Sequence, residues 1–227
     1  MEKNSHIREE AINFLQNNKD KYGIFEFDCI MGAFECYSLN DLYLNEFTRE
    51  ILDELGFIPD DFNIYKEFFD IIDNVHKIDG KNVVEIGGGI YSRLAKIMSL
   101  KQTNGTITVY DPRLSDVSSS ERLIMKKEKL GDSSKIDNCD LLVGLMPCEG
   151  AEVLIDLALK NKIDFVLWLC EGGPHGDEFD FYDNDVEWRA SMIDKAQVGV
   201  KMNGMGELNV KVLSKFSKEY PIIYNKK

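Results

Sequence analysis

The chain has 227 residues and a mass of 26.0 kDa, and 44% of its residues are hydrophobic and 30% charged, which is typical of a soluble globular protein of one or two domains. A net charge of −13 disfavours a broad basic surface, so a small molecule is a more expected partner than a nucleic acid. The longest apolar run, near "DFVLWLC", is too short to cross a bilayer, and the first residues contain no apolar signal segment. We therefore expect a cytoplasmic protein with no membrane partner.

Residues 1–78 are predicted to form a helical N-terminal segment. Apolar residues recur at helical spacing over 5–21, 40–55 and 62–72. The aromatic stretch "IFEFDCIMGAFECYS" between the first two helices fits either an extended arm or part of a lid. We expect the segment to cover the ligand site, and the candidate wall residues are Tyr22, Phe25, Phe27 and Tyr37. Packing on the far side of a sheet, or contact with a second copy in a homodimer, is the alternative.

Residues 79–227 are predicted to form an α/β domain. Five short apolar runs, "NVVEI", "TITVYD", "LIMKKEKL", "DLLVGLM" and "DFVLWLC", read as buried strands, and helical patterns separate several of them. This alternation predicts a mostly parallel sheet with helices on both faces. The last two runs, "ELNVKVLSKF" and "YPIIYNKK", lie too close together for a helical crossover and predict a C-terminal antiparallel hairpin.

A glycine turn follows the first strand in "KNVVEIGGGIYSRLAKIM". Ligands of such sheets bind beyond the carboxyl ends of the strands, and consecutive glycines allow the backbone to approach a ligand closely. A nicotinamide cofactor would require G-x-G-x-x-G, but Ser92 stands in the third place, and Glu85 would repel a pyrophosphate. The carboxylate suits a ligand that carries positive charge.

The same residues resemble the first motif of the class I S-adenosylmethionine-dependent methyltransferases, an acidic residue followed by G-x-G-x-G, with Tyr91 in place of the third glycine. "TVYDP" places Asp111 where that family has an acidic residue that binds the ribose hydroxyls, and the family's sheet also ends in an antiparallel hairpin. The resemblance implies a Rossmann-like methyltransferase sheet over 79–227 and S-adenosyl-L-methionine as the cofactor. The cofactor-binding residues that it implies are Glu85, Gly87, Gly88, Gly89, Ile90, Tyr91, Asp111, Pro112, Leu130, Gly144 and Met146.

Candidates for an acid or base in methyl transfer lie on the loops after the fourth and fifth strands: Glu149, Glu171 and His175. For His175 a solvated loop histidine is an equal alternative. The acidic run 177–187 fits a solvated loop better than a metal site, so we predict no metal.

Two cysteines, Cys148 and Cys170, also follow these strands, as in enzymes that methylate cytosine C5 through a cysteine adduct. Their flanking residues do not match those enzymes, and two buried core cysteines are the simpler interpretation. The sequence therefore predicts an S-adenosylmethionine-dependent methyltransferase acting on a small molecule. The alternatives are an RNA or tRNA methyltransferase, an NAD-dependent oxidoreductase, and a non-catalytic cofactor-binding protein of the same fold.

Overall fold

The computed structural model describes residues 2–22, 24–36, 39–42, 46–55, 64–115, 117, 119–131, 134–170, 185–213 and 220–226. The chain divides into two compact units, a helical unit that extends to Ile64 and a sheet unit that begins at Tyr65. None of the helices within these ranges combines the length and hydrophobicity needed to cross a lipid bilayer.

The helical unit contains α1 (Glu2–Asn17), the 3₁₀ turn η1 (Lys19–Lys21), α2 (Ile24–Cys36), α3 (Leu39–Leu42) and α4 (Glu46–Glu54). Most of the aromatic stretch forms α2, so the extended-arm interpretation is wrong. Ile30 and Phe34, one helical turn apart, are both buried, which gives α2 an apolar face and explains the helix. Of the predicted wall residues, Tyr37 lies outside the described residues. The covering role of this unit stays a prediction.

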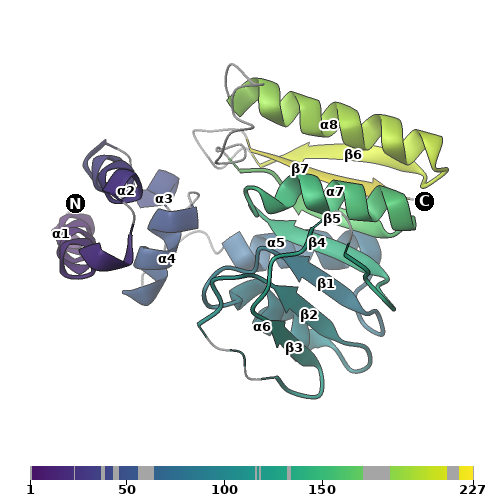
Figure 1. The fold of residues 1–227 in the computed structure, drawn as a ribbon, viewed down its shortest axis with the longest axis horizontal. Coiled ribbons are helices and arrows are strands. Elements are labelled where there is room, and N and C mark those ends of the chain that lie inside the picture. The colour runs from purple at the N-terminus through teal and green to yellow at the C-terminus, as the bar shows by residue number, and fades with distance from the viewer. Residues whose placement is uncertain are drawn as a thin grey trace. The chain divides into compact units, whose positions relative to one another are not determined.

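The sheet unit confirms the predicted fold class. Its described residues form seven strands: β1 (Val83–Ile86), β2 (Ile107–Tyr110), β3 (Leu123–Lys126), β4 (Leu141–Leu145), β5 (Asp164–Trp168), β6 (Glu207–Val212) and β7 (Pro221–Lys226). They lie in the order β3-β2-β1-β4-β5-β7-β6 (Figure 1). The first five strands are parallel, whereas β7 is antiparallel to both β5 and β6, which confirms the hairpin.

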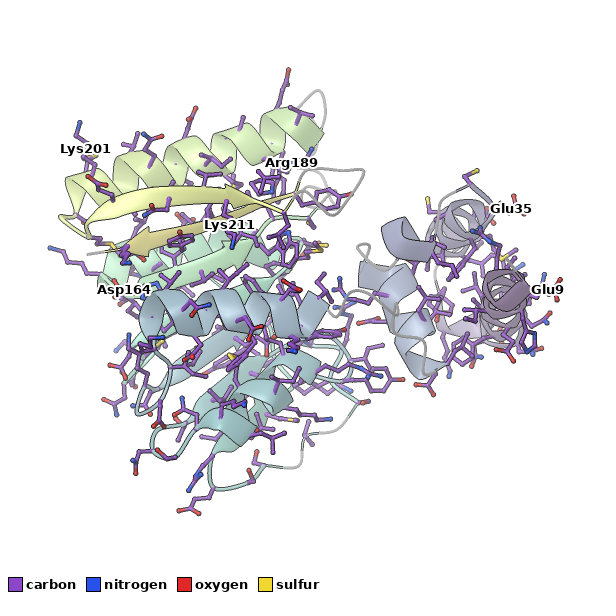
Figure 2. The ribbon with its side chains drawn as sticks, turned by 180° about the vertical axis from the view of Figure 1, so that it is seen from behind. Glu9, Glu35, Asp164, Arg189, Lys201 and Lys211 are labelled. Carbon is purple, nitrogen blue, oxygen red and sulfur yellow. The ribbon has the colours of Figure 1, made fainter. Side chains whose placement is uncertain are left out.

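Helices cover both faces of the sheet. These are α5 (Ile64–His76), α6 (Arg93–Lys101), α7 (Gly150–Asn161) and α8 (Asp185–Met202). The ring of Phe68 in α5 lies 5.6 Å from that of Trp168 in β5. Leu167, the neighbour of Trp168 in β5, points to the opposite face of the sheet. On that face Leu167 and Leu154 of α7 both lie close to Gly144. Accordingly α7 and α8 lie in front of the sheet in Figure 1, and α5 lies in front in the reverse view of Figure 2.

The strand order reverses direction between β1 and β4. The chain runs outward from β1 through β2 to β3, and then returns to the other side of β1 to add β4 and β5. A ligand crevice forms where two neighbouring connections leave a sheet in opposite directions, at the carboxyl ends of the strands. In this sheet that place holds the glycine turn after β1, the loop after β2 and the loop after β4.

Candidate functional site

The glycine turn lies between β2 and the loop that follows β4. Gly87 has a φ of +73°, and a Cβ atom at this position would lie 2.6 Å from the Cβ of Pro147. A Cβ at Gly88 would lie 2.4 Å from Cγ1 of Val109 in β2. Both distances are far below van der Waals contact, so the packing of the fold requires glycine at both positions, whether or not a ligand is bound.

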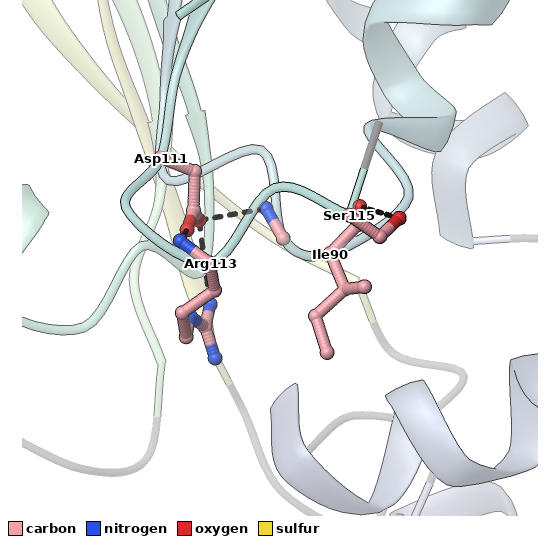
Figure 3. Close-up of polar contacts among 5 residues, drawn as sticks. Ile90, Asp111, Arg113 and Ser115 are labelled. Atoms are coloured by element: carbon pink, nitrogen blue, oxygen red, sulfur yellow. Dashed lines mark hydrogen bonds and ion pairs between the residues drawn. The ribbon is translucent and has the colours of Figure 1, made fainter. Parts of the chain in front are cut away.

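The carboxylate of Asp111, at the end of β2, holds the glycine turn in place (Figure 3). Its Oδ2 accepts the Gly89 backbone N–H at 2.9 Å, and its Oδ1 accepts the Arg113 backbone N–H at 2.7 Å. The Arg113 guanidinium donates to Oδ2 at a longer 3.3 Å. Asp111 is only 2% exposed. The structure therefore brings together two of the predicted cofactor motifs, which are 22 residues apart in sequence.

A second contact joins the same two loops. The Ile90 carbonyl oxygen accepts hydrogen bonds from the Ser115 backbone N–H at 3.1 Å and from the Ser115 hydroxyl at 3.0 Å (Figure 3). Sequence reasoning missed Ser115 and Arg113, because a serine and an arginine in an exposed loop carry no pattern that identifies their partners. The glycine turn and the loop after β2 form one hydrogen-bonded unit.

Glu85 lies beneath the turn and is 1% exposed. It accepts a hydrogen bond from the Ala95 backbone N–H in the first turn of α6. It thereby acts as the helix cap, since Ser92 at the N-cap position has a left-handed backbone and makes no side-chain cap bond. Among the described residues, Glu85 Oε2 and Ser92 Oγ have no hydrogen-bond partner.

Burial, and secondly the negative charge of Asp111, raise the pKa of Glu85 to about 8. At neutral pH the side chain is therefore mostly a neutral acid. A neutral acid does not repel a pyrophosphate, so the charge argument from the sequence applies only when a bound cation has displaced the proton. The contribution of Glu85 to discrimination between S-adenosylmethionine and a nicotinamide dinucleotide thus depends on whether its carboxyl group is protonated.

The other predicted cofactor residues differ in their exposure. Gly144 and Met146 are buried in and after β4, and the Met146 N–H donates to the Trp168 carbonyl oxygen at 2.8 Å. Leu130 is 7% exposed and Pro112 is exposed. Tyr91 is half-buried, with the Arg93 guanidinium 5.7 Å from its ring centre. Contact between these residues and a cofactor stays a prediction.

Of the three candidate catalytic residues, the structure describes only Glu149. It is the N-cap residue of α7, and its carboxylate pairs with Lys129 Nζ at 2.5 Å. Glu171 and His175 lie outside the described residues, as does most of the acidic run 177–187. Within the described ranges, no group of three or more His, Cys, Asp or Glu side chains is placed to hold a metal ion.

The two strand-end cysteines are in contact. Cys148 Sγ lies 3.6 Å from Cys170 Sγ, and neither is in a disulfide. The sequence placed both after neighbouring strands, but only the pairing of β4 with β5 determines that the thiols meet. Cys170 is buried, as predicted, whereas Cys148 is half-buried.

Comparison with known proteins gives structural likenesses only, since no protein-family model and no curated protein matches the chain. A precorrin-8w decarboxylase from Methanobacterium thermoautotrophicum is 14% identical, with a TM-score of 0.44 over 71% of this chain and 90% of that one. An Aeropyrum pernix fibrillarin with bound S-adenosyl-L-methionine is 14% identical, with a TM-score of 0.43 over 71% of this chain and 75% of that one. A precorrin-6y C5,15-methyltransferase from Geobacter metallireducens is 12% identical, with a TM-score of 0.42 over 71% and 88%.

The fold is that of the class I methyltransferases. The strand order and the terminal antiparallel hairpin carry this assignment. Likenesses of this size give no information about the activity or the substrate.

The raised pKa of Glu85 makes a prediction about stability. The folded-state pKa of about 8 exceeds the ordinary value of 4.5, so the unfolded chain releases this proton at a lower pH than the folded protein does. The free energy of unfolding therefore falls as the pH rises from the lower to the higher of these values. Glu85→Gln removes the titration. The variant should therefore gain stability relative to the wild type by up to a few kcal/mol as the pH rises from about 5 to about 8.5, measured by denaturant unfolding.

Two controls isolate this effect. Burial lowers the pKa of His76, so this group makes the free energy of unfolding rise with pH. The contribution is the same in both proteins and cancels in their difference. Glu121→Gln removes the same acidic group from an exposed side chain and is the matched control. A constant difference between Glu85→Gln and wild type over this pH range would mean that Glu85 is ionised in the folded state.

Proposed function

We propose that the protein is an S-adenosylmethionine-dependent methyltransferase that acts on a small-molecule acceptor. The observation that carries this proposal is the 2.9 Å hydrogen bond between the Gly89 N–H and Asp111 Oδ2. It places the glycine turn and the strand-end carboxylate side by side where the strand order reverses, the position at which an adenosine-containing ligand binds in sheets of this class.

The described residues suit a ligand with both a ribose and a cationic group. Asp111 would accept the ribose hydroxyls, and its 3.3 Å bond to the Arg113 guanidinium is the contact most easily exchanged for them. Glu85 Oε2 and Ser92 Oγ, both beside Gly88, are buried oxygens for which the described part of the chain provides no partner. An ammonium group nearby would stabilise the ionised form of Glu85 and lower its pKa.

The bound cofactor would supply a methyl group on a sulfonium, and the neutral thioether that remains after transfer is a good leaving group. The protein would then contribute mainly by aligning the acceptor with the methyl carbon. Glu149, Glu171 and His175 are proposed to accept the proton of the acceptor where the acceptor has one to lose. The helical unit is proposed to exclude water from the acceptor site or, alternatively, to form a homodimer contact.

A small-molecule acceptor is favoured over RNA by the net charge of −13, because RNA binding depends on basic residues that neutralise phosphates. An NAD-dependent oxidoreductase is disfavoured by the terminal hairpin and by Ser92 in place of the third glycine of the dinucleotide motif.

Calorimetric titration with S-adenosylhomocysteine and with NAD tests the cofactor class. We expect S-adenosylhomocysteine to bind, since its ammonium can pair with Glu85, and NAD to give no response. Tight NAD binding with no response to S-adenosylhomocysteine would contradict the proposal.

Substitution of Asp111 tests the ribose contact. Asp111→Ala removes a charged acceptor, so the affinity for S-adenosylhomocysteine should fall about ten- to a hundredfold. Thermal stability should fall as well, because the Gly89 and Arg113 N–H groups lose their partner. Asp137→Ala, which removes the same charge from an exposed residue, is the matched control. Unchanged affinity in Asp111→Ala would place the ribose elsewhere.

A further inference from the structure

The contact between Cys148 and Cys170 joins the two loops that border the proposed acceptor side of the site. Cys148 lies three residues beyond the end of β4, and Cys170 lies two residues beyond the end of β5. Their sulfur atoms are 3.6 Å apart, and a disulfide requires about 2.05 Å. The two sulfur atoms would have to approach by about 1.5 Å to form the bond.

The two thiols differ in their access to solvent. Cys148 is half-buried and precedes the N-terminus of α7, where the helix dipole favours a thiolate. Cys170 is buried, and the Arg189 guanidinium donates to its backbone carbonyl oxygen at 3.3 Å. An oxidant from solvent would reach Cys148 first, and Cys170 is positioned to react in the second step.

We propose that Cys148 and Cys170 are a peroxide-sensitive dithiol whose oxidation to a disulfide weakens cofactor binding. The Cys148 thiol releases its proton, and the thiolate attacks one oxygen of hydrogen peroxide and breaks the O–O bond. This gives a sulfenic acid and a hydroxide, which takes up the released proton and leaves as water. Cys170 then attacks the Cys148 sulfur and loses its proton, so that the S–S bond forms as the S–O bond breaks. The hydroxide that leaves takes up this proton and becomes a second water. The two thiols lose two electrons and two protons in total, and the peroxide is reduced to water.

The packing of Pro147 connects this bond to the cofactor turn. Pro147 precedes Cys148 and lies directly against Gly87, where even a Cβ atom would approach it to 2.6 Å. A movement of Cys148 toward Cys170 would move Pro147, and the close packing of Pro147 against Gly87 would transmit this movement to the turn. The backbone N–H groups of the turn would then be displaced from the cofactor. This effect on binding rests on the proposed function, whereas the disulfide itself does not.

Peptide mapping of the full-length protein tests the modification. The native protein is treated with a small molar excess of hydrogen peroxide, alkylated, digested without reductant and analysed by mass spectrometry. We expect a Cys148–Cys170 linked peptide that dithiothreitol removes. Cys29 and Cys36, which are exposed, report that the oxidant was active. Oxidation of these two without a Cys148–Cys170 link would overturn the proposal.

Cysteine variants and a binding measurement test the consequence. The affinity for S-adenosylhomocysteine should fall at least about tenfold on oxidation and return on reduction. In Cys148→Ser and in Cys170→Ser, treatment with peroxide should leave the affinity for S-adenosylhomocysteine unchanged. Cys139→Ser is the matched control and should respond like the wild type, because burial raises the pKa of this thiol to about 11 and keeps it protonated.

The outcomes separate the two proposals. A reversible disulfide with unchanged affinity would overturn the link to the cofactor turn. Failure of the reduced protein to bind S-adenosylhomocysteine would overturn the proposed function, and the peptide map would still decide whether the dithiol is oxidised.

Discussion

The carboxylate of Asp111 is the group on which the candidate site depends. It is 2% exposed and cannot rely on water, so its charge is stabilised by the Gly89 N–H, the Arg113 N–H and the Arg113 guanidinium. In return, it fixes the glycine turn against the end of β2 and gives the Gly89 N–H a partner. A ligand that engages Asp111 must compete with these bonds, and Arg113 is the donor that can leave at the least cost.

Glu85 and Asp111 lie close enough for the charge of one to affect the proton of the other. Glu85 is the more buried of the two and has one fixed donor, the Ala95 N–H, so the balance of burial and repulsion favours its neutral form. A cation bound beside Gly88 would reverse this balance. The specificity of the site for a cationic ligand would thus be expressed as release of a proton rather than as attraction by a permanent charge.

Close packing couples the two sides of the site. A Cβ atom at Gly87 would clash with Pro147 of the loop after β4, and one at Gly88 would clash with Val109 of β2, so the turn is confined from both sides. The loop after β4 is in turn linked to β5 by the Met146 N–H to Trp168 carbonyl bond. A change at the end of β5 therefore has a continuous packed route to the cofactor turn.

The sequence alone determined the strands, the hairpin and the location of the glycine turn. These follow from local patterns: buried parallel strands read as apolar runs, and a short connection excludes a helical crossover. The tertiary structure alone decided that "IFEFDCIMGAFEC" forms a helix, that Glu85 caps α6 from beneath the turn, and that Cys148 meets Cys170. Each of these depends on which segments pack together, because burial sets the pKa of an acid and strand pairing sets the distance between two loops, and neither is encoded in the spacing of residues along the chain.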